Sequence, residues 1–205
     1  DIMFSNALPS IEEVKKHYGI TFKEYAIAIL HPVTTEYEQQ EANTQLFAEA
    51  LTDSNQNYII IYPNNDLGSD AIMRVYKKEL SNLERIKMVP SIRFEYFLTL
   101  LHEALFIIGN SSSGIHEAPV YGVPTINIGS RQDNRFHYES IINIPFDIDA
   151  ILNEVVRFST KTRYPETDHY GKGDSAVRFM KALRSTELWE ISKQKKFRDI
   201  EHEYH

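Results

Sequence analysis

The sequence predicts an α/β protein built on a Rossmann-like, doubly wound parallel sheet. Short apolar runs rich in β-branched residues alternate with longer amphipathic stretches, an order that neither a β-sandwich nor a helical bundle would produce. The short runs are apolar at successive positions, as in strands that helices cover on both faces. Polar residues follow several runs directly, at the places where open parallel sheets bind their ligands.

The predicted strands and helices alternate along the chain. Five apolar runs are expected to form strands, at residues 24–30, 57–63, 85–90, 105–109 and 123–129. The intervening amphipathic stretches are expected to form helices at residues 35–54, 69–80 and 92–104, with later helices at 147–159 and 175–185. Thr35 and Glu38 have the spacing of a capping box, which predicts that the first of these helices begins there.

Composition and charge narrow the class of function. The 205 residues, 42% hydrophobic and 25% charged, suit one globular domain with a sizeable core. A formal net charge of −7 provides no basic field for a polyanion, so neither nucleic acid nor a membrane is an expected partner. The absence of cysteine excludes disulfides and thiolate chemistry. We expect a cytoplasmic protein, and the first residue, Asp1, suggests a piece of a longer chain.

Three predicted strands end in residues that could contact a ligand. His31 precedes Pro32, which favours an extended backbone, and its imidazole could bond a phosphate, move a proton, or merely bond a backbone carbonyl. Asn64 lies in a turn-forming segment, where a ligand contact would add to its role in the turn. Val89 ends the third strand, and its backbone could meet the edge of a nucleobase or simply end the strand.

The segment GNSSSG at residues 109–114 is the strongest candidate for a binding site. Ser111, Ser112 and Ser113 offer hydroxyls and backbone N–H groups at an expected helix N-terminus, which suits a phosphate. The segment matches neither G-x-G-x-x-G nor a Walker A loop. The residues alone therefore leave anion binding and plain helix capping both open. Pro119 conflicts with a long helix that begins at Ser113.

Two charged residues extend this candidate site. Glu117 would repel a phosphate unless it points elsewhere, for example at the paired hydroxyls of a ribose. Arg131 follows the fifth strand and could neutralise a diphosphate through its guanidinium fork, with Arg135 as an alternative. The competing interpretation is a surface ion pair between Glu117 and Arg131, which would contribute little. Taken together, the serines, the carboxylate and the arginine indicate a nucleotide-diphosphate site.

These segments resemble a known family. The stretches HPVTTE, YPNND, GNSSSGIHEAPVYGVPTINIGSRQ and YGKGDSAVRFMKAL, in this order and spacing, resemble the carboxyl-terminal half of the UDP-N-acetylglucosamine 2-epimerase family. They are most similar to its hydrolysing branch, which makes N-acetylmannosamine for sialic acid synthesis. The resemblance implies that residues 1–205 form one lobe of a two-lobed glycosyltransferase-B-like fold. A helix at about 174–187 could then pack either on this lobe or on the missing first lobe.

The resemblance also implies which residues bind UDP. By the family pattern, Ser111 and Ser112 hold the diphosphate, Glu117 holds the ribose, and Val89 contacts the uracil through its backbone. The implied ligand is a UDP-sugar, with neither a cofactor nor a metal. The full-length parent is implied to be a homo-oligomer.

The implied chemistry is an elimination followed by addition of water. By the family pattern, Asn64 and Arg131 make further nucleotide contacts, while His31 acts in catalysis or contacts the diphosphate. Removal of the C2 proton and expulsion of UDP give a glycal-like intermediate, and water then releases the inverted free sugar. Because the proton-transferring carboxylates belong to the first lobe in this family, the fragment alone is expected to be inactive.

Two other functions fit the same residues. The chain could be a lobe of a UDP-sugar-dependent glycosyltransferase, or a non-catalytic module for nucleotide binding or dimerisation. His116 departs from the residues common in the family, which leaves N-acetylglucosamine and a diacetamido-trideoxy sugar both open as substrate sugars. His202 and His205 near the end of the chain lack a matching set of ligands, so no metal site is expected.

Overall fold

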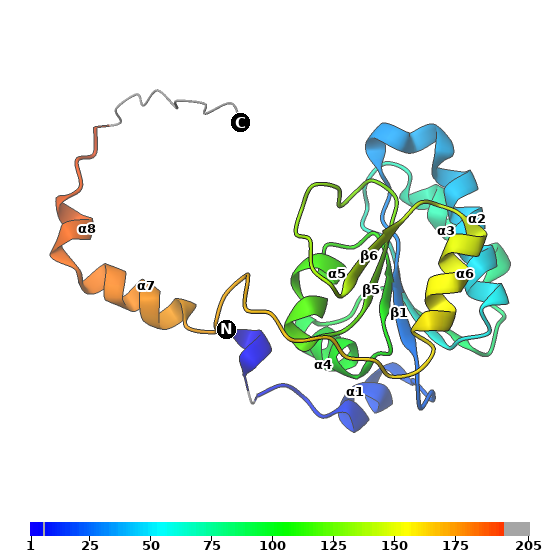
Figure 1. Ribbon diagram of the computed structural model, residues 1–205, viewed down its shortest axis with the longest axis horizontal. Helices are drawn as coiled ribbons and strands as arrows, with labels where there is room; N and C mark the ends of the chain where they lie inside the picture. Colours follow the sequence, from blue (N-terminus) through cyan, green and yellow to red (C-terminus); the bar gives the residue numbers. More distant parts are fainter. Residues whose placement is uncertain (6, 195–205) are drawn as a thin grey trace.

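A computed structural model describes residues 1–5 and 7–194 (Figure 1). Its centre is a six-stranded sheet in which all strands are parallel, in the order β3-β2-β1-β4-β5-β6. The strands are β1 (Ala26–Ile29), β2 (Tyr58–Ile61), β3 (Ile86–Val89), β4 (Ile107–Gly109), β5 (Thr125–Ile128) and β6 (Ile141–Ile144). The chain winds outward from β1 to β3 and then returns to β4, so the direction of winding reverses between β1 and β4.

The carboxyl ends of the strands are aligned along one edge. Ile29, the last residue of β1, pairs with Ile61 of β2 and with Gly109 of β4. The five predicted strands are confirmed, each a little shorter than the apolar run that predicted it. β6 was not predicted, although three of its four residues are isoleucine, because the run is short and Asn143 interrupts it. The alignment places the loops that follow the strands beside one another.

Helices cover both faces of the sheet (Figure 1). The α-helices are α1 (Ile11–Tyr18), α2 (Gln40–Asp53), α3 (Ser69–Glu79), α4 (Phe94–Glu103), α5 (Ser113–His116), α6 (Ile148–Arg157), α7 (Ser175–Arg184) and α8 (Thr186–Glu190). The 3-10 helices are η1 (Ile2–Phe4), η2 (Thr34–Gln39) and η3 (Ala118–Tyr121). One apolar core holds Phe47, Ile72 and Val155 from α2, α3 and α6, and the other holds Val14 and Leu98 from α1 and α4. The sheet is therefore buried on both faces, as predicted.

The first predicted helix begins later than the sequence predicted. The expected capping box at Thr35 and Glu38 does not form, because residues 34–39 make the 3-10 helix η2, in which Glu36 has a non-helical φ of −119°. The α-helix begins only at Gln40. Its buried side chain accepts a hydrogen bond from the backbone N–H of Val33 (3.1 Å), which holds the loop after β1 against the helix. The other predicted helices are confirmed within a few residues.

The last two helices project away from the sheet (Figure 1). Neither α7 nor α8 contains a buried residue. The Asp1 carboxylate accepts hydrogen bonds from the backbone N–H groups of Ser175 and Ala176, both at 2.9 Å, and so caps the start of α7. In the described part of the chain, no helix has both the length and the apolar character needed to cross a membrane.

Candidate functional site

Four of the predicted site residues follow strands at the aligned edge of the sheet. His31 comes after β1, Asn64 after β2, Ser111 after β4 and Arg131 after β5. This edge includes the reversal point between β1 and β4, where doubly wound sheets bind ligands. The structure thus brings together residues that are up to 100 positions apart in the sequence (31 to 131).

Asn110 connects three of the strands that meet here. Its side chain is 1% exposed and pairs with the backbone of His31: Oδ1 accepts from the His31 N–H (2.7 Å), and Nδ2 donates to the His31 carbonyl (2.9 Å). The Asn110 carbonyl oxygen accepts from Arg131 Nη1 (3.1 Å) and from Gln132 Nε2 (2.9 Å). The sequence reasoning gave Asn110 no role, because its partners lie far from it in the sequence.

The tautomer of His31 follows from its neighbours. The backbone N–H of Asn64 donates to His31 Nδ1 (3.1 Å), so in the neutral ring the proton is on Nε2. Burial lowers the pKa of His31 to about 4, with a further contribution from the positive charge of Arg131, while Asp66 opposes the shift. At neutral pH, His31 is therefore an uncharged ring with an Nε2–H donor.

Two glycines allow the serine segment to approach the sheet closely. Gly109 has a φ of +125°, and a Cβ atom there would overlap the carbonyl oxygen of Ile29. A Cβ atom on Gly114 would lie 2.5 Å from Cγ2 of Thr125. Thr125 Oγ1 also donates to the Gly114 carbonyl (2.7 Å), which ties the turn to β5. Close backbone approach explains why both ends of this segment are glycine.

The helix that follows the serines is a single turn. α5 contains only four residues, and Ser112 at its N-cap makes no capping hydrogen bond through its side chain. The helix ends before Pro119, which lies in the first turn of η3, where a missing N–H costs nothing. The conflict over Pro119 is thus resolved. A single turn has a small dipole, so any anion here depends on individual N–H groups, hydroxyls and Arg131.

Glu117 lies half-buried at the end of α5 and next to η3. Burial raises the pKa of its carboxyl group, and a hydrogen bond from the Ser113 side chain opposes this effect. None of the ion pairs among the described residues joins Glu117 to Arg131, so the predicted alternative of a surface ion pair is wrong. The carboxylate is instead tied to the serine turn.

A cavity of about 230 Å³ opens at the ends of β1 and β2. Its polar wall contains His31, Ser111 and Ser113. Its apolar wall contains Ile29, Ile61, Ile92, Phe94 and Phe97. The Phe94 side chain is 45% exposed in the first turn of α4, so part of its ring is available to a ligand. The sequence reasoning missed Phe94 because it assigned residues 92–104 to a well-buried helix.

Two predicted positions lie somewhat apart from this cavity. Val89 ends the edge strand β3 and is buried, and its carbonyl oxygen accepts from the N–H of Tyr62 (3.1 Å). Arg135 lines a different hollow of about 450 Å³, together with His116 and Tyr170. Burial and the nearby charge of Arg135 both lower the pKa of Arg131. Arg131, which contacts Asn110, is thus the better placed of the two arginines.

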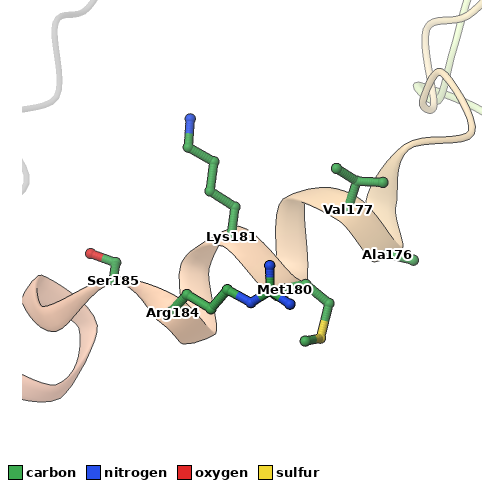
Figure 2. A pocket seen from close by; sticks show the side chains of 6 residues that line it. All are labelled: Ala176, Val177, Met180, Lys181, Arg184 and Ser185. Atoms are coloured by element: carbon green, nitrogen blue, oxygen red, sulfur yellow. The ribbon is translucent and has the colours of Figure 1, made fainter.

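Another hollow, of about 720 Å³, lies on α7 (Figure 2). Its lining residues are Ala176, Val177, Met180, Lys181, Arg184 and Ser185. One helix and its end supply all of them, so the hollow is the side of an exposed helix and not an enclosed site.

Metal ligands do not gather at any of these places. Within residues 1–5 and 7–194, no three His, Asp or Glu side chains are grouped as a metal ion would require. His202 and His205, which the sequence analysis considered as metal ligands, lie outside the described residues.

Comparison with known proteins places the chain in a family. The family model for UDP-N-acetylglucosamine 2-epimerase matches residues 1–184. A UDP-N-acetylglucosamine 2-epimerase of Neisseria meningitidis is 42% identical over 203 residues, covering 98% of this chain and 53% of that protein. A UDP-N,N'-diacetylbacillosamine 2-epimerase (hydrolyzing) of Legionella pneumophila is 27% identical, covering 92% of this chain and 53% of that protein. The chain thus spans about half the length of these relatives.

A solved structure confirms the fold class. The crystal structure of a Methanocaldococcus jannaschii UDP-GlcNAc 2-epimerase in complex with UDP-GlcNAc and UDP superposes with a TM-score of 0.64 at 18% identity, covering 84% of this chain and 48% of that one. This similarity shows the fold, and it agrees with the predicted Rossmann-like lobe of a glycosyltransferase-B-like protein. The motifs of the present chain, its fold and the family match over residues 1–184 agree. The chain belongs to the UDP-N-acetylglucosamine 2-epimerase family.

Proposed function

We propose that this chain is the UDP-binding lobe of a hydrolysing UDP-N-acetylglucosamine 2-epimerase. The observation that carries the proposal is the cavity at the reversal point of the sheet, which has one polar wall and one apolar wall. A nucleoside diphosphate needs both, because its base is flat and largely apolar on its faces while its phosphates need donors. The family match supports the choice of UDP.

The two walls suggest how UDP lies. The uracil would stack on the exposed ring of Phe94 and meet the backbone near Val89, while the diphosphate would take hydrogen bonds from Ser111 and Ser112. Arg131 contacts the Asn110 carbonyl through one of its five N–H donors and so points toward the serine turn. A positive charge there offsets the charge of the diphosphate.

The ribose would lie between the base and the phosphates. Glu117 is hydrogen-bonded to the side chain of Ser113, which also lines the cavity. The Glu117 carboxylate would therefore lie close to the diphosphate position. A carboxylate in this place can accept hydrogen bonds from the two ribose hydroxyls. Asn64 would add a contact from the end of β2.

We propose that His31 assists departure of UDP. In an elimination, a base takes the C2 proton, the C1–O bond breaks, and the electron pair leaves with the diphosphate, which gains negative charge. The Nε2–H group of neutral His31 can donate to that oxygen and stabilise the charge. His31 is a poor candidate for the base, because its low pKa disfavours taking a proton. The base would come from the other half of the parent protein.

The rest of the parent would also cover α7. This chain spans about half of its relatives, and α7 exposes apolar side chains, among them Val177 at 72% and Phe179 at 64%. We propose that residues 1–205 form one Rossmann-like lobe and that α7 packs on the other lobe. The parent would act as a cytoplasmic homo-oligomer, and this chain alone would be inactive.

The full-length parent tests the proposed reaction. Given UDP-N-acetylglucosamine, it should release UDP and free N-acetylmannosamine in equal amounts, without an acceptor. Transfer of the sugar to an added acceptor would instead identify a glycosyltransferase, and no reaction with the sugar nucleotide would support a non-catalytic module. Release of UDP from a diacetamido-trideoxy sugar nucleotide alone would keep the hydrolysing mechanism and change the substrate.

A further inference from the structure

Asn110 makes five hydrogen bonds that join the ends of three strands, yet its side chain is buried away from the cavity. We propose that Asn110 is a positioning residue that sets His31 and Arg131 at a fixed separation, so that both reach one diphosphate. This inference rests on the proposed function, since it concerns the same site. Its structural half, the placement of His31, can be tested without any ligand.

The side chain of Asn110 extends the sheet by one residue. Regular pairing between β1 and β4 stops at Ile29 and Gly109, and the Asn110 N–H donates to the Ile29 carbonyl (3.1 Å). Beyond this point, the Asn110 amide replaces a strand by pairing with both the N–H and the carbonyl of His31. Pro32 has no N–H to continue a ladder, so this amide pair fixes the last residue before the loop.

A fixed backbone at His31 also fixes its ring. The N–H of Asn64 donates to Nδ1 only if the ring lies over the end of β2. With the backbone released, the ring could turn, and the Nε2–H donor would no longer point at one place. Asn110 therefore acts on the ligand through His31 and does not touch it.

The backbone carbonyl of Asn110 positions the loop after β5 in a similar way. It accepts from Arg131 and from the buried Gln132, which brings the loop after β5 onto the serine turn. Because one residue carries both sets of bonds, a shift of Asn110 changes the distance between His31 and Arg131. A diphosphate held by both is sensitive to that distance, since hydrogen bonds weaken within a few tenths of an ångström.

Three variants of the present chain test the proposal. Asn110→Ala removes both bonds to His31. Asn110→Asp keeps the acceptor for the His31 N–H and loses the donor to its carbonyl. Asn127→Ala is the matched control, because Asn127 is equally buried (1% exposed) and bonds Asn143 between β5 and β6 (2.8 Å), without contacting His31 or Arg131.

The readouts are the ¹⁵N chemical shifts of the His31 ring in the ligand-free chain and the dissociation constant for UDP. In Asn110→Ala, the shifts should move from a single Nε2–H tautomer toward an averaged ring, and UDP should bind about tenfold more weakly. Asn110→Asp should give changes of the same kind that are at least as large, because its second carboxylate oxygen faces and repels the His31 carbonyl oxygen. Asn127→Ala should alter neither readout, even where it lowers the free energy of unfolding.

The outcomes separate the inference from the proposed function. If Asn110→Ala keeps the wild-type ring shifts, or if Asn127→Ala changes them as much, Asn110 is merely structural and the inference is wrong. If Asn110→Ala does not fold, the Asn110→Asp shifts decide alone, and wild-type values overturn the inference. If the wild-type chain fails to bind UDP while the ring shifts change as expected, the placement of His31 is supported and the UDP site is not.

Discussion

His31 shows at the scale of single residues how the fold sets chemistry. The sequence predicted a histidine at the end of a strand and left its role open between ligand contact and a bond to backbone. The structure shows that the side-chain amide of Asn110 fixes the main chain of His31 and that the backbone N–H of Asn64, which donates to Nδ1, fixes its ring. A histidine with its acceptor already used is a hydrogen-bond donor at neutral pH.

The first prediction concerns the titration of His31. Its pKa is lowered to about 4 in the folded chain, whereas an unfolded histidine titrates near 6.5. As the pH falls from about 6.5 toward 4, the unfolded state therefore binds a proton that the folded state does not, and the folded state loses stability. An NMR titration of the ring should give a midpoint near 4, and His31→Gln should reduce the fall in unfolding free energy across this window. A midpoint near 6.5 would show that the ring is open to solvent.

From the sequence, a side chain could be placed where it directly follows a strand. His31, Asn64, Ser111 and Arg131 lie at one edge of the sheet as expected, because parallel strands bring their ends to one edge, and their contacts with a ligand stay predictions. Asn110 escaped notice because its importance lies in contacts to residues 79 positions earlier and 21 and 22 positions later. No local pattern carries such information.

At the scale of elements, the proposed phosphate site depends on the individual donors of the short serine turn more than on a helix dipole. The sequence predicted a helix N-terminus at the serines and left Pro119 in conflict with it; in the structure α5 stops after one turn and η3 accommodates Pro119. The sequence reasoning also did not predict α1, β6 and α8. The signals for α1 were present, since Ser10 caps it by accepting from the Glu13 N–H (3.2 Å) and Gly19 ends it with a φ of +60°. β6 gave a weaker signal, because its run of isoleucines is short and Asn143 interrupts it.

The second prediction concerns Gly109. In Gly109→Ala, the new methyl group would overlap the Ile29 carbonyl oxygen in a backbone conformation with a φ of +125°, so β4 must shift away from β1. Gly171→Ala is the control, because Gly171 also has a positive φ (+138°) but nothing lies within 4 Å of an added Cβ. We expect Gly171→Ala to cost about 1 kcal/mol or somewhat more from the backbone alone, and Gly109→Ala to cost clearly more. If urea unfolding showed that both variants lose the same free energy of unfolding, the close approach of β1 and β4 would be contradicted.

The third prediction concerns the cap of α6. Asp147 Oδ1 accepts from the N–H of Ala150 (2.8 Å) at the first turn of the helix. Asp147→Ala should lower the unfolding free energy by about 1 kcal/mol, because this N–H loses its partner. Asp147→Asn should keep most of the wild-type unfolding free energy, because its side-chain oxygen can still accept this hydrogen bond. Since α6 lies on the face that packs with α2, UDP binding should not change. A similar loss in both variants would mean that the charge, not the cap, provides the stability.

At the scale of the whole molecule, the described chain has a compact sheet and two projecting helices (Figure 1). The sequence predicted the parallel sheet correctly, since runs apolar on both faces need helices on both sides. It also predicted α7, but local periodicity cannot say what covers a helix. Trp189 in α8 is 70% exposed, and Val177 and Phe179 in α7 are similarly open. Exposed apolar surface of this kind marks a binding partner.

The fourth prediction tests what covers α7. In the present chain, the amides of α7 should exchange with solvent rapidly, because no part of the helix is buried. In the full-length parent, the same amides should become protected if the other lobe packs on them. The amides of α4, whose residues 97–101 are buried in the present chain, provide the reference. Equally rapid exchange of α7 in the parent would rule out this packing.

The most direct test of the central claim is a map of amide chemical-shift changes when UDP is added to this chain. UDP bound at the reversal point should change the signals of His31, Ser111–Ser113 and Glu117 in a saturable way. Arg131→Ala should weaken these changes, whereas Arg74→Ala should leave them intact, because Arg74 is exposed and pairs with Glu41 on the surface. Saturable changes confined to other parts of the sheet, or no changes at millimolar UDP, would contradict the proposed site.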